Sequence, residues 1–399
     1  MSKFMAVVLA ILVSSLQLIS AADWPEFLGP DGCRISQEKD WSPDALKKPK
    51  ILWKKNVGHG YSAVSVKDGL LYTMGFNGGN DIVTCLKADT GEKVWEKTYP
   101  CSKGKRYPGP RCTPTISDGA VYTLSRQGHL LCMSVKDGSV KWKKNIVKEL
   151  KAGIPHWGLA SSVRIVGNLA VVNAGACGMA FDKKSGRKIW SGGGGKSSYS
   201  TPVIIKKGAT VYAILFPVSG PAMVRLKDGK KLWSYPWKTK YDVNAADPLL
   251  IGKNVFVSSG YNTGCVMLNI STGKPKKLWQ NRNMSAHFTS PVEIDGYIYG
   301  VSGNTSGGKL TCIEARTGKV KWSEHRGAES FMVADNKLIV IDKDGTLLIV
   351  KAQPSKYTVL AQANVINQSA KYWTMPVLCN GKIYCRNSLG TLVCVDVKK

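Results

Sequence analysis

The hydrophobic positions of this chain fall in short runs separated by turn residues at regular intervals. Gly, Asn and Asp between β-branched and aromatic runs predict tight hairpins, because these residues tolerate a positive φ. One such turn opens each unit of the chain, at Asp68-Gly69, Asp118-Gly119, Gly167-Asn168, Lys207-Gly208, Gly252-Lys253, Asp295-Gly296, Asp335-Asn336 and Asn380-Gly381. Two further turns in most units predict four antiparallel strands per unit, which is the pattern of a propeller blade.

Tryptophan recurs once in nearly every unit, after a glycine turn and a short alternating strand. The steps between successive members are 42, 47, 48, 43, 46 and 43 residues, for Trp53, Trp95, Trp142, Trp190, Trp233, Trp279 and Trp322. Self-similarity in this range indicates a propeller or a solenoid. An indole buries a large area and needs a partner for its N–H, so we expect these side chains to be structural.

The eight opening turns predict an all-β, eight-bladed propeller of four-stranded antiparallel blades. The seventh unit has lost the pattern, with Pro354-Ser355 at the turn and Leu360 in place of tryptophan. The eighth unit ends at VCVDVKK without a last strand, and the segment ILWKK around Trp53 would supply it. Such pairing of the first and last segments closes the ring and removes an exposed edge. An open β-solenoid, the competing architecture, would not need this strand.

The N-terminus resembles a targeting segment. Lys3 precedes an apolar run over 4–19 and then Ser20-Ala21-Ala22, which is typical of a secretory signal peptide cleaved after Ala22. The run is short for a membrane-spanning helix, although a retained anchor is the alternative. We therefore expect a signal peptide at 1–22, a leader at 23–50 and the propeller at 51–399. The mature protein would be periplasmic or secreted, with no transmembrane span.

The charge balance is strongly basic, with 56 Lys and Arg against 27 Asp and Glu and a net charge of +29. Lysines gather beside the repeat tryptophans, as at 47–50, 141–144 and 274–277, where they also guard outer strands against edge pairing. The surplus should attract anionic partners. Exported proteins rarely meet nucleic acid, so we expect an acidic protein, an anionic polysaccharide or lipopolysaccharide, and a monomeric propeller.

Eleven cysteines in an exported chain raise the question of disulfides. Cys85, Cys132, Cys312 and Cys394 each occupy the same place in a repeated phrase, which predicts buried, unbonded thiols. Cys101 and Cys112 flank the loop SKGKRYPGPR and are the best candidates for a disulfide. The five histidines have no metal-like spacing, so no metal site is expected.

The phrases KADTGEKVW and EARTGKVKW resemble the tryptophan-docking repeat of the pyrroloquinoline-quinone (PQQ) propeller superfamily. DWPEFLGPDGCRIS resembles the leader phrase of secreted bacterial PQQ-like repeat proteins. The resemblance covers about residues 24–399 and implies that the repeat tryptophans stack between blades. The family includes quinoprotein alcohol dehydrogenases and the non-enzymatic propeller lipoprotein of the outer-membrane β-barrel assembly machinery, so the resemblance leaves function open.

The enzymatic members imply PQQ on the propeller axis beside Ca²⁺, with two adjacent cysteines and several oxygen ligands. This sequence has no adjacent cysteine pair, and Asp242, Asp247 and Glu329 are the few acids expected near the axis. Ca²⁺ takes six to eight oxygens. We therefore expect no cofactor and no catalytic residue. A quinoprotein alcohol or sugar dehydrogenase with PQQ and Ca²⁺ is the alternative.

Residues just before the inner strand of each blade should surround one mouth of the channel. The predicted binding residues are Arg111, His156, Trp157, Tyr199, Asp247, His287, Glu329, Tyr372 and Trp373, with Tyr61, Asn244 and Phe288 beside them. Such a mixed aromatic and polar set suits a planar or sugar-like ligand, the latter on Trp157, Tyr199 and Trp373. The expected function is that of an exported, non-catalytic binding or scaffolding propeller that recognises a protein or an anionic polymer.

Overall fold

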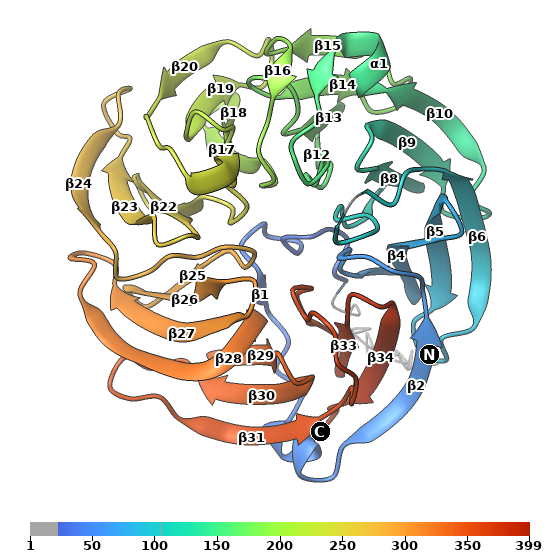
Figure 1. Cartoon of the computed structure of the whole chain (residues 1–399), viewed down its shortest axis with the longest axis vertical. Coiled ribbons are helices and arrows are strands. Elements are labelled where there is room, and N and C mark those ends of the chain that lie inside the picture. Colours follow the sequence, from blue (N-terminus) through green and yellow to red (C-terminus); the bar gives the residue numbers. More distant parts are fainter. Residues whose placement is uncertain (1–22, 105) are drawn as a thin grey trace, which may run out of the picture.

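Eight antiparallel blades surround a central axis in the computed structural model, which describes residues 23–104 and 106–399 (Figure 1). The predicted signal peptide at 1–22 lies outside the described residues. The strands of blades one to four, from the axis outward, are β3 (Ser65–Lys67), β4 (Leu70–Asn77), β5 (Asn80–Lys87), β6 (Lys93–Pro100); β7 (Thr115–Ser117), β8 (Ala120–Leu124), β9 (His129–Ser134), β10 (Val140–Asn145); β12 (Arg164–Val166), β13 (Leu169–Val172), β14 (Met179–Asp182), β15 (Lys188–Ser191); and β17 (Val203–Lys207), β18 (Thr210–Leu215), β19 (Ala222–Arg225), β20 (Lys231–Ser234). The predicted eight-bladed propeller is thus confirmed.

Blades six and seven share one continuous strand. The strands of blades five to eight are β21 (Leu249–Ile251), β22 (Asn254–Ser259), β23 (Gly264–Asn269), β24 (Lys276–Asn281); β25 (Val292–Ile294), β26 (Tyr297–Asn304), β27 (Gly307–Glu314), β28 (Val320–Ala334); the second half of β28, β29 (Lys337–Asp342), β30 (Thr346–Lys351), β31 (Val359–Asn364); and β32 (Val377–Cys379), β33 (Lys382–Arg386), β34 (Thr391–Asp396), β2 (Lys50–Asn56). β28 is the outer strand of blade six and then the inner strand of blade seven.

The ring closes through the N-terminal strand, as predicted. β2 pairs antiparallel with β34, with Trp53 opposite Cys394. At this seam Arg386 of β33, which is 1% exposed, donates hydrogen bonds to the carbonyl oxygens of Gly58 (2.8 Å) and Ser62 (2.9 Å). A side chain of the last blade therefore joins the first blade directly.

The repeat tryptophans join neighbouring blades. Nε1 of Trp190, for example, donates to the carbonyl oxygen of Leu226 in the next blade at 2.7 Å. The ring stacks on Gly229, where φ is +72° and a Cβ atom would lie 2.6 Å from the indole. The same N–H-to-carbonyl bond recurs at Trp53, Trp95, Trp142, Trp279 and Trp322. Trp233 is the exception, since its Nε1 finds no partner among the described residues.

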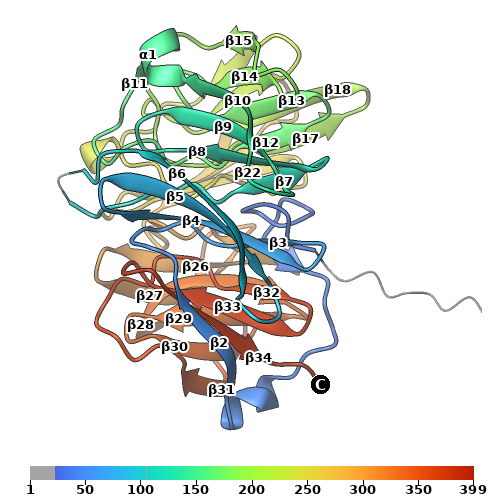
Figure 2. The same cartoon turned by 90° about the vertical axis from the view of Figure 1, so that its right-hand side faces the viewer.

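The leader before β2 crosses one face of the ring (Figure 2). It forms a bridge between Trp24 and Val66, and β1 (Ile35–Ser36) then pairs parallel with β28. The 3₁₀ helix η1 (Pro43–Lys47) packs against β31, the strand that carries Leu360 in place of tryptophan. Trp41 and Leu46 are buried here, so the leader covers the degenerate blade.

The remaining elements are short. They are α1 (Ile146–Leu150), the 3₁₀ helix η2 (Lys240–Asp242) and the parallel pair of β11 (Ala152–Gly153) with β16 (Gly195–Lys196). Within residues 23–104 and 106–399, no helix is long and apolar enough to cross a membrane.

The predicted disulfide is not formed. Cys101 and Cys112, both within the described chain, are free and buried thiols. Cys112 accepts a hydrogen bond from the backbone N–H of Leu124 and donates one to the carbonyl oxygen of Thr113. The buried Asp81 carboxylate interacts with the thiol of Cys101. The two cysteines therefore lie in different polar surroundings. The repeated cysteines Cys85, Cys132, Cys312 and Cys394 are buried and unbonded, as predicted.

Candidate binding cavity on the propeller axis

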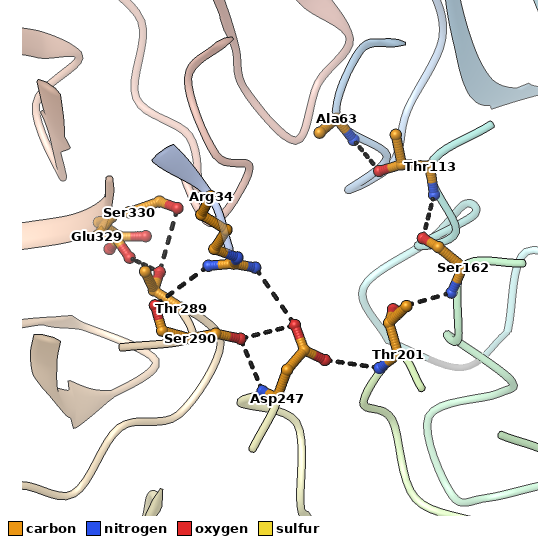
Figure 3. A network of polar contacts seen from close by, with 10 residues as sticks. All are labelled: Arg34, Ala63, Thr113, Ser162, Thr201, Asp247, Thr289, Ser290, Glu329 and Ser330. Carbon is orange, nitrogen blue, oxygen red and sulfur yellow. Dashed lines mark hydrogen bonds and ion pairs between the residues drawn. The ribbon is translucent and has the colours of Figure 1, made fainter. Parts of the chain in front are cut away.

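Equivalent residues of successive blades are linked around the axis by hydrogen bonds (Figure 3). In each link a backbone N–H of one blade donates to a side-chain oxygen of the next. The donor and acceptor pairs are Ala63 to Thr113 (3.0 Å), Thr113 to Ser162 (3.0 Å), Ser162 to Thr201 (3.2 Å), Thr201 to Asp247 (2.6 Å) and Asp247 to Ser290 (2.7 Å). This chain of bonds fixes the inner strands of blades one to six around a common opening.

The leader inserts Arg34 into this opening (Figure 3). The guanidinium is 2% exposed, lies 3.7 Å from Oδ2 of Asp247 and donates to the carbonyl oxygen of Ser290 at 3.3 Å. Burial lowers the pKa of Arg34 to about 10, although the Asp247 carboxylate opposes that shift. Together with Phe27, whose ring Arg34 covers at 4.6 Å, it forms the floor of an axial cavity.

Both carboxylate oxygens of Asp247 already accept hydrogen bonds. Its Oδ1 accepts from the Thr201 N–H at 2.6 Å, and its Oδ2 accepts from Ser290 Oγ at 2.8 Å and faces Arg34. Burial raises the pKa of this carboxyl, although Arg34 and these hydrogen bonds act against the shift. Asp247 therefore helps to hold the floor of the cavity closed.

Above this floor lies a cavity that is open at its mouth and has walls that are mainly aromatic. One half of the wall is a run of rings in contact. Tyr241 meets Tyr261 at 5.3 Å between ring centroids, and Tyr261 meets His287 at 4.8 Å. His287 contacts Phe288 at 3.9 Å, and Phe288 contacts Trp373 at 4.2 Å.

The run continues from Trp373 around the other side of the mouth. Trp373 stacks on Tyr61 at 5.1 Å and meets the edge of Tyr107 at 5.0 Å. Tyr107 contacts Trp157 at 5.5 Å, and Trp157 contacts His156 at 4.5 Å. These nine rings, which we call the aromatic arc, come from the loops of most blades and extend from Tyr241 to His156.

A single arginine side chain interrupts the aromatic wall. Arg111 donates to the carbonyl oxygens of Gly109 and Tyr107, both at 2.9 Å, and lies 5.4 Å from the centroid of Tyr61. Burial lowers its pKa to about 10, and the neighbouring Arg126 acts in the same direction. Within the described chain Arg111 forms no ion pair, although the buried Asp81 carboxylate acts on its charge.

The structure brings most of the predicted binding residues to this cavity. The residues that line it are Arg111, Trp157, Tyr199, Asp247, His287 and Trp373. His156 is exposed and touches the arc only through Trp157. Tyr372 does not reach the cavity, because its hydroxyl donates to the carbonyl oxygens of Ile366 and Gln368 in the interior.

Glu329 faces a smaller side void instead of the main cavity. His287, Phe288 and Trp373 separate the two spaces and line both. Burial raises the pKa of Glu329 to about 7, although Lys371 and the N–H of Tyr372, which donates to its Oε2 at 3.3 Å, favour the charged form. Burial also lowers the pKa of His287 to about 4. Both groups are candidates for a ligand-dependent change of protonation.

Sequence reasoning missed several residues that shape the cavity. Phe27 and Arg34 come from the leader, and Tyr107 and Tyr261 come from loops. The loop SKGKRYPGPR was singled out for its flanking cysteines and for Arg111, but not for Tyr107. Nothing in the leader phrase indicates that it crosses the axis, because that path depends on contacts far apart in the chain.

The described residues of the cavity offer few oxygen ligands for a calcium-bound quinone. Ca²⁺ requires six to eight oxygen ligands, and both oxygens of Asp247 are already engaged. Within residues 23–104 and 106–399, no group of three or more His, Cys, Asp or Glu could hold a metal ion. The cavity offers flat apolar surfaces and one positive charge, which suit binding.

Comparison with known proteins places this architecture in a family. The family described as outer membrane protein assembly factor BamB matches residues 44–216 and, in an overlapping placement, 79–324. The BamB of Burkholderia pseudomallei is 22% identical over 268 residues, which cover 64% of this chain and 65% of that protein. This alignment therefore spans less than two thirds of the relative's length.

Two solved structures share the fold. The crystal structure of BamB from Moraxella catarrhalis superposes with a TM-score of 0.64 at 15% identity, covering 87% of this chain and 97% of that one. The quinohemoprotein alcohol dehydrogenase of Comamonas testosteroni superposes with a TM-score of 0.67 at 13% identity, covering 94% and 80%. Both the predicted PQQ-like repeat and the propeller are thus confirmed, and the chain belongs to the family of the outer membrane protein assembly factor BamB.

Proposed function

We propose that this protein is an exported, non-catalytic propeller that binds a protein partner during outer-membrane assembly. The family match supports this role, because the relatives carry the name of an assembly factor. The signal peptide expected at 1–22 would deliver the chain to the periplasm. A protein partner is preferred over a polysaccharide or lipopolysaccharide because those relatives are named for protein assembly.

The observation that carries this proposal is the aromatic arc with its positive neighbours. Tyr241 is 60% exposed at the rim, and the ammonium of Lys240 lies 5.1 Å from its ring centroid. Arg106 stands over Tyr107 at 5.0 Å. Aromatic residues and arginine are enriched in protein interfaces, where they supply much of the binding energy. The cations and the net charge of +29 favour a partner with an acidic surface.

Site-specific cross-linking in cells tests the proposal. A photo-crosslinking residue, p-benzoylphenylalanine, replaces Tyr241 on the rim or, as a matched control, Leu278 on the outer strand β24, which is 50% exposed. We expect light-dependent adducts with outer-membrane β-barrel proteins or their assembly machinery from position 241 only. Absence of such adducts, or the same adducts from both positions, would contradict binding at the open mouth.

A second candidate is a quinoprotein oxidoreductase with a reduced cofactor site. The aromatic cavity on the axis and the fold shared with a quinohemoprotein alcohol dehydrogenase favour it, and the engaged oxygens of Asp247 oppose it. A thermal-shift titration of the purified chain with PQQ and Ca²⁺ separates the two. A ligand at a hundredfold excess over its Kd stabilises the folded state by about 2.7 kcal/mol. We expect no shift, whereas a shift with dye reduction by an alcohol or aldose would favour the enzyme.

A further inference from the structure

A groove separate from the axial cavity lies between blades one and two. It is formed near the ends of their outer strands, β6 and β10 (Figure 1). Its walls come from the turn between β4 and β5, the loop after β6, the turn between β8 and β9, and the segment that runs from β10 through α1. We call this hollow the interblade groove. The loop after β6 also supplies Tyr107 and Arg111 to the axial cavity, so the two hollows share one loop.

The interblade groove is positively charged. Lys103 and Lys148 line it, are exposed, and form no ion pair within the described chain. His129 also lines it, and burial lowers the pKa of this imidazole. Lys148 and the exposed Lys143 of β10 act on His129 in the same direction, so three cationic side chains surround this position.

The acids nearby are engaged with other cations. Glu149 of α1 forms an ion pair with Lys144 at 3.5 Å. Asp81 is fully buried, and the cations that act on its carboxylate are Arg126 and Arg111, neither of which lines the groove. Among the described residues that line the groove there is no Asp or Glu. Its two lysines are therefore available to an anionic partner.

The side-chain amides of the groove present donors as well. Oε1 of Gln127 accepts a hydrogen bond from the N–H of Ser102 at 2.8 Å. Oδ1 of Asn145 accepts from the N–H groups of Val147 at 3.2 Å and Lys148 at 3.0 Å. Each amide keeps its NH₂ group, which has no hydrogen-bond partner within the described residues. Ammonium and amide donors together suit a guest that is rich in acceptors, such as carboxylates.

Apolar side chains line the groove beside these donors. They include Val147, which is half-buried, and Ile154, which is 40% exposed. Among the described lining residues there is no arginine, the side chain that best matches phosphate, so carboxylates are favoured over phosphates. A second copy of this chain is a poor occupant, because each copy carries a net charge of +29. An acidic chain segment with apolar side chains fits these surroundings best.

We propose that the interblade groove binds an acidic, partly apolar segment of a partner protein. Its carboxylates contact Lys103 and Lys148, and its apolar side chains pack against Val147 and Ile154. This assigns a contact surface beyond the mouth of the axial cavity. It rests on the proposed function only in naming a protein as the source of the segment.

Fluorescence anisotropy of the purified full chain with labelled peptides tests the proposal. The titrations are done at physiological ionic strength, where exposed charges more than about 8 Å apart are largely screened from each other. The probe is an amidated peptide of glutamates interspersed with leucines. One control peptide has glutamine at every glutamate, and the other has serine at every leucine. We expect each control to bind about tenfold more weakly than the probe.

Two pairs of exposed lysines provide matched variants. Lys103→Gln with Lys148→Gln removes the two charges of the groove, and Lys206→Gln with Lys207→Gln removes two charges from blade four. Both double variants lower the net charge by the same amount, so general attraction by the basic surface falls equally. The groove variant should bind the acidic peptide about fivefold more weakly, and the blade-four variant should change its affinity by less than about twofold.

The position of the bound peptide can be read from two histidines. His129 lines the interblade groove, and His287 lines the axial cavity. In NMR titrations of the unaltered chain, we expect the ring resonances of His129 to shift with the acidic peptide and those of His287 to stay in place. A shift of His287 alone would place the peptide on the axis and overturn the proposal.

Three further outcomes would overturn the proposal. They are equal loss of affinity in the two double variants, equal binding of the acidic and glutamine peptides, and absence of peptide binding. Phosphatidylglycerol vesicles that bind only when Lys103 and Lys148 are present, while the acidic peptide does not bind, would assign the groove to a lipid surface instead. Cross-linking at Tyr241 is measured independently, so failure of the peptide titrations leaves the proposed function at the axial mouth standing.

Discussion

Arg34 of the leader lies 3.7 Å from Asp247 of blade five, and this ion pair closes one end of the propeller channel. Both side chains are almost completely buried. The leader is therefore part of the cavity, because it supplies the floor on which a ligand would rest. Its removal would convert a blind cavity into an open channel.

Breaking this pair should destabilise the fold. Asp247→Asn leaves a buried guanidinium without its anionic partner, and Arg34→Leu leaves a buried carboxylate without its cation. Loss of one partner of a buried pair costs about 3–5 kcal/mol. We expect a loss of about 3 kcal/mol in the free energy of unfolding for each variant, measured in urea. The double variant should lose less than the sum of the two. Lys47→Gln, in the exposed leader pair with Asp44, is the control and should change stability by less than about 0.5 kcal/mol.

The stability of the seam between the first and last blades should depend on the guanidinium of Arg386. Besides Gly58 and Ser62, Arg386 donates to Thr73 Oγ1 at 2.8 Å and to the Met74 carbonyl oxygen at 2.6 Å. Arg386→Leu leaves these buried acceptors unsatisfied, so we expect a loss of about 3 kcal/mol or more in chemical denaturation.

Two further variants control the experiment on the seam. Arg386→Lys should fail to rescue stability, because one ammonium cannot reproduce the forked geometry. Arg316→Leu removes an arginine whose side chain is 84% exposed and should have little effect. Equal stability of Arg386→Leu and the unaltered chain would show that the seam does not rely on this side chain.

The repeat tryptophans should differ in how much each contributes to the free energy of unfolding. Trp190→Phe removes the hydrogen bond to Leu226, whereas Trp233→Phe removes an N–H that has no partner in the described chain. Both side chains are buried to a similar degree, so the difference isolates the hydrogen bond. We expect Trp190→Phe to cost about 1 kcal/mol more than Trp233→Phe in urea denaturation. Equal costs would mean that indole hydrogen bonds contribute nothing between blades.

Glu329 should make stability depend on pH between its ordinary pKa of 4.5 and its folded-state pKa of about 7. In this window the folded state retains a proton that the unfolded state has lost, so stability falls as the pH rises. We expect a decrease on the order of 2 kcal/mol across the window from this group. Glu329→Gln should flatten the profile, and Glu92→Gln at an exposed turn is the control. An unchanged slope in Glu329→Gln would contradict this assignment.

The blades were predictable because their signals are local. Each hairpin depends on residues adjacent in sequence, as at Asp335-Asn336, which connects β28 to β29. The strand shared by blades six and seven was not predictable in the same way. β28 passes from blade six to blade seven through an irregularity at Gly327, where φ is +67°, so the pairing changes from β27 to β29 within one strand.

The segments that line the cavity could be predicted, but not which of two adjacent residues faces it. Successive side chains of an extended segment point to opposite sides, so a shift of one position exchanges the cavity for the interior. Trp373 therefore lines the cavity, whereas its neighbour Tyr372 is buried between loops. The floor could not be predicted at all, since Arg34 meets Asp247 only after the whole ring has formed.

Closure of the ring by β2 has a consequence for the timing of folding. Lys50 and Asp396 pair across 346 positions of the chain, so the last sheet stays incomplete until residue 396 has been synthesised. Contacts of such long range slow folding, and an unpaired strand edge invites association with other chains. Trp53 already docks on Ala88 of blade one, which tethers β2 while seven blades are made. β2 is thus held beside blade one until β34 has been made and can pair with it. A nascent chain truncated before β34 would leave the edges of both β2 and β33 unpaired and open to aggregation.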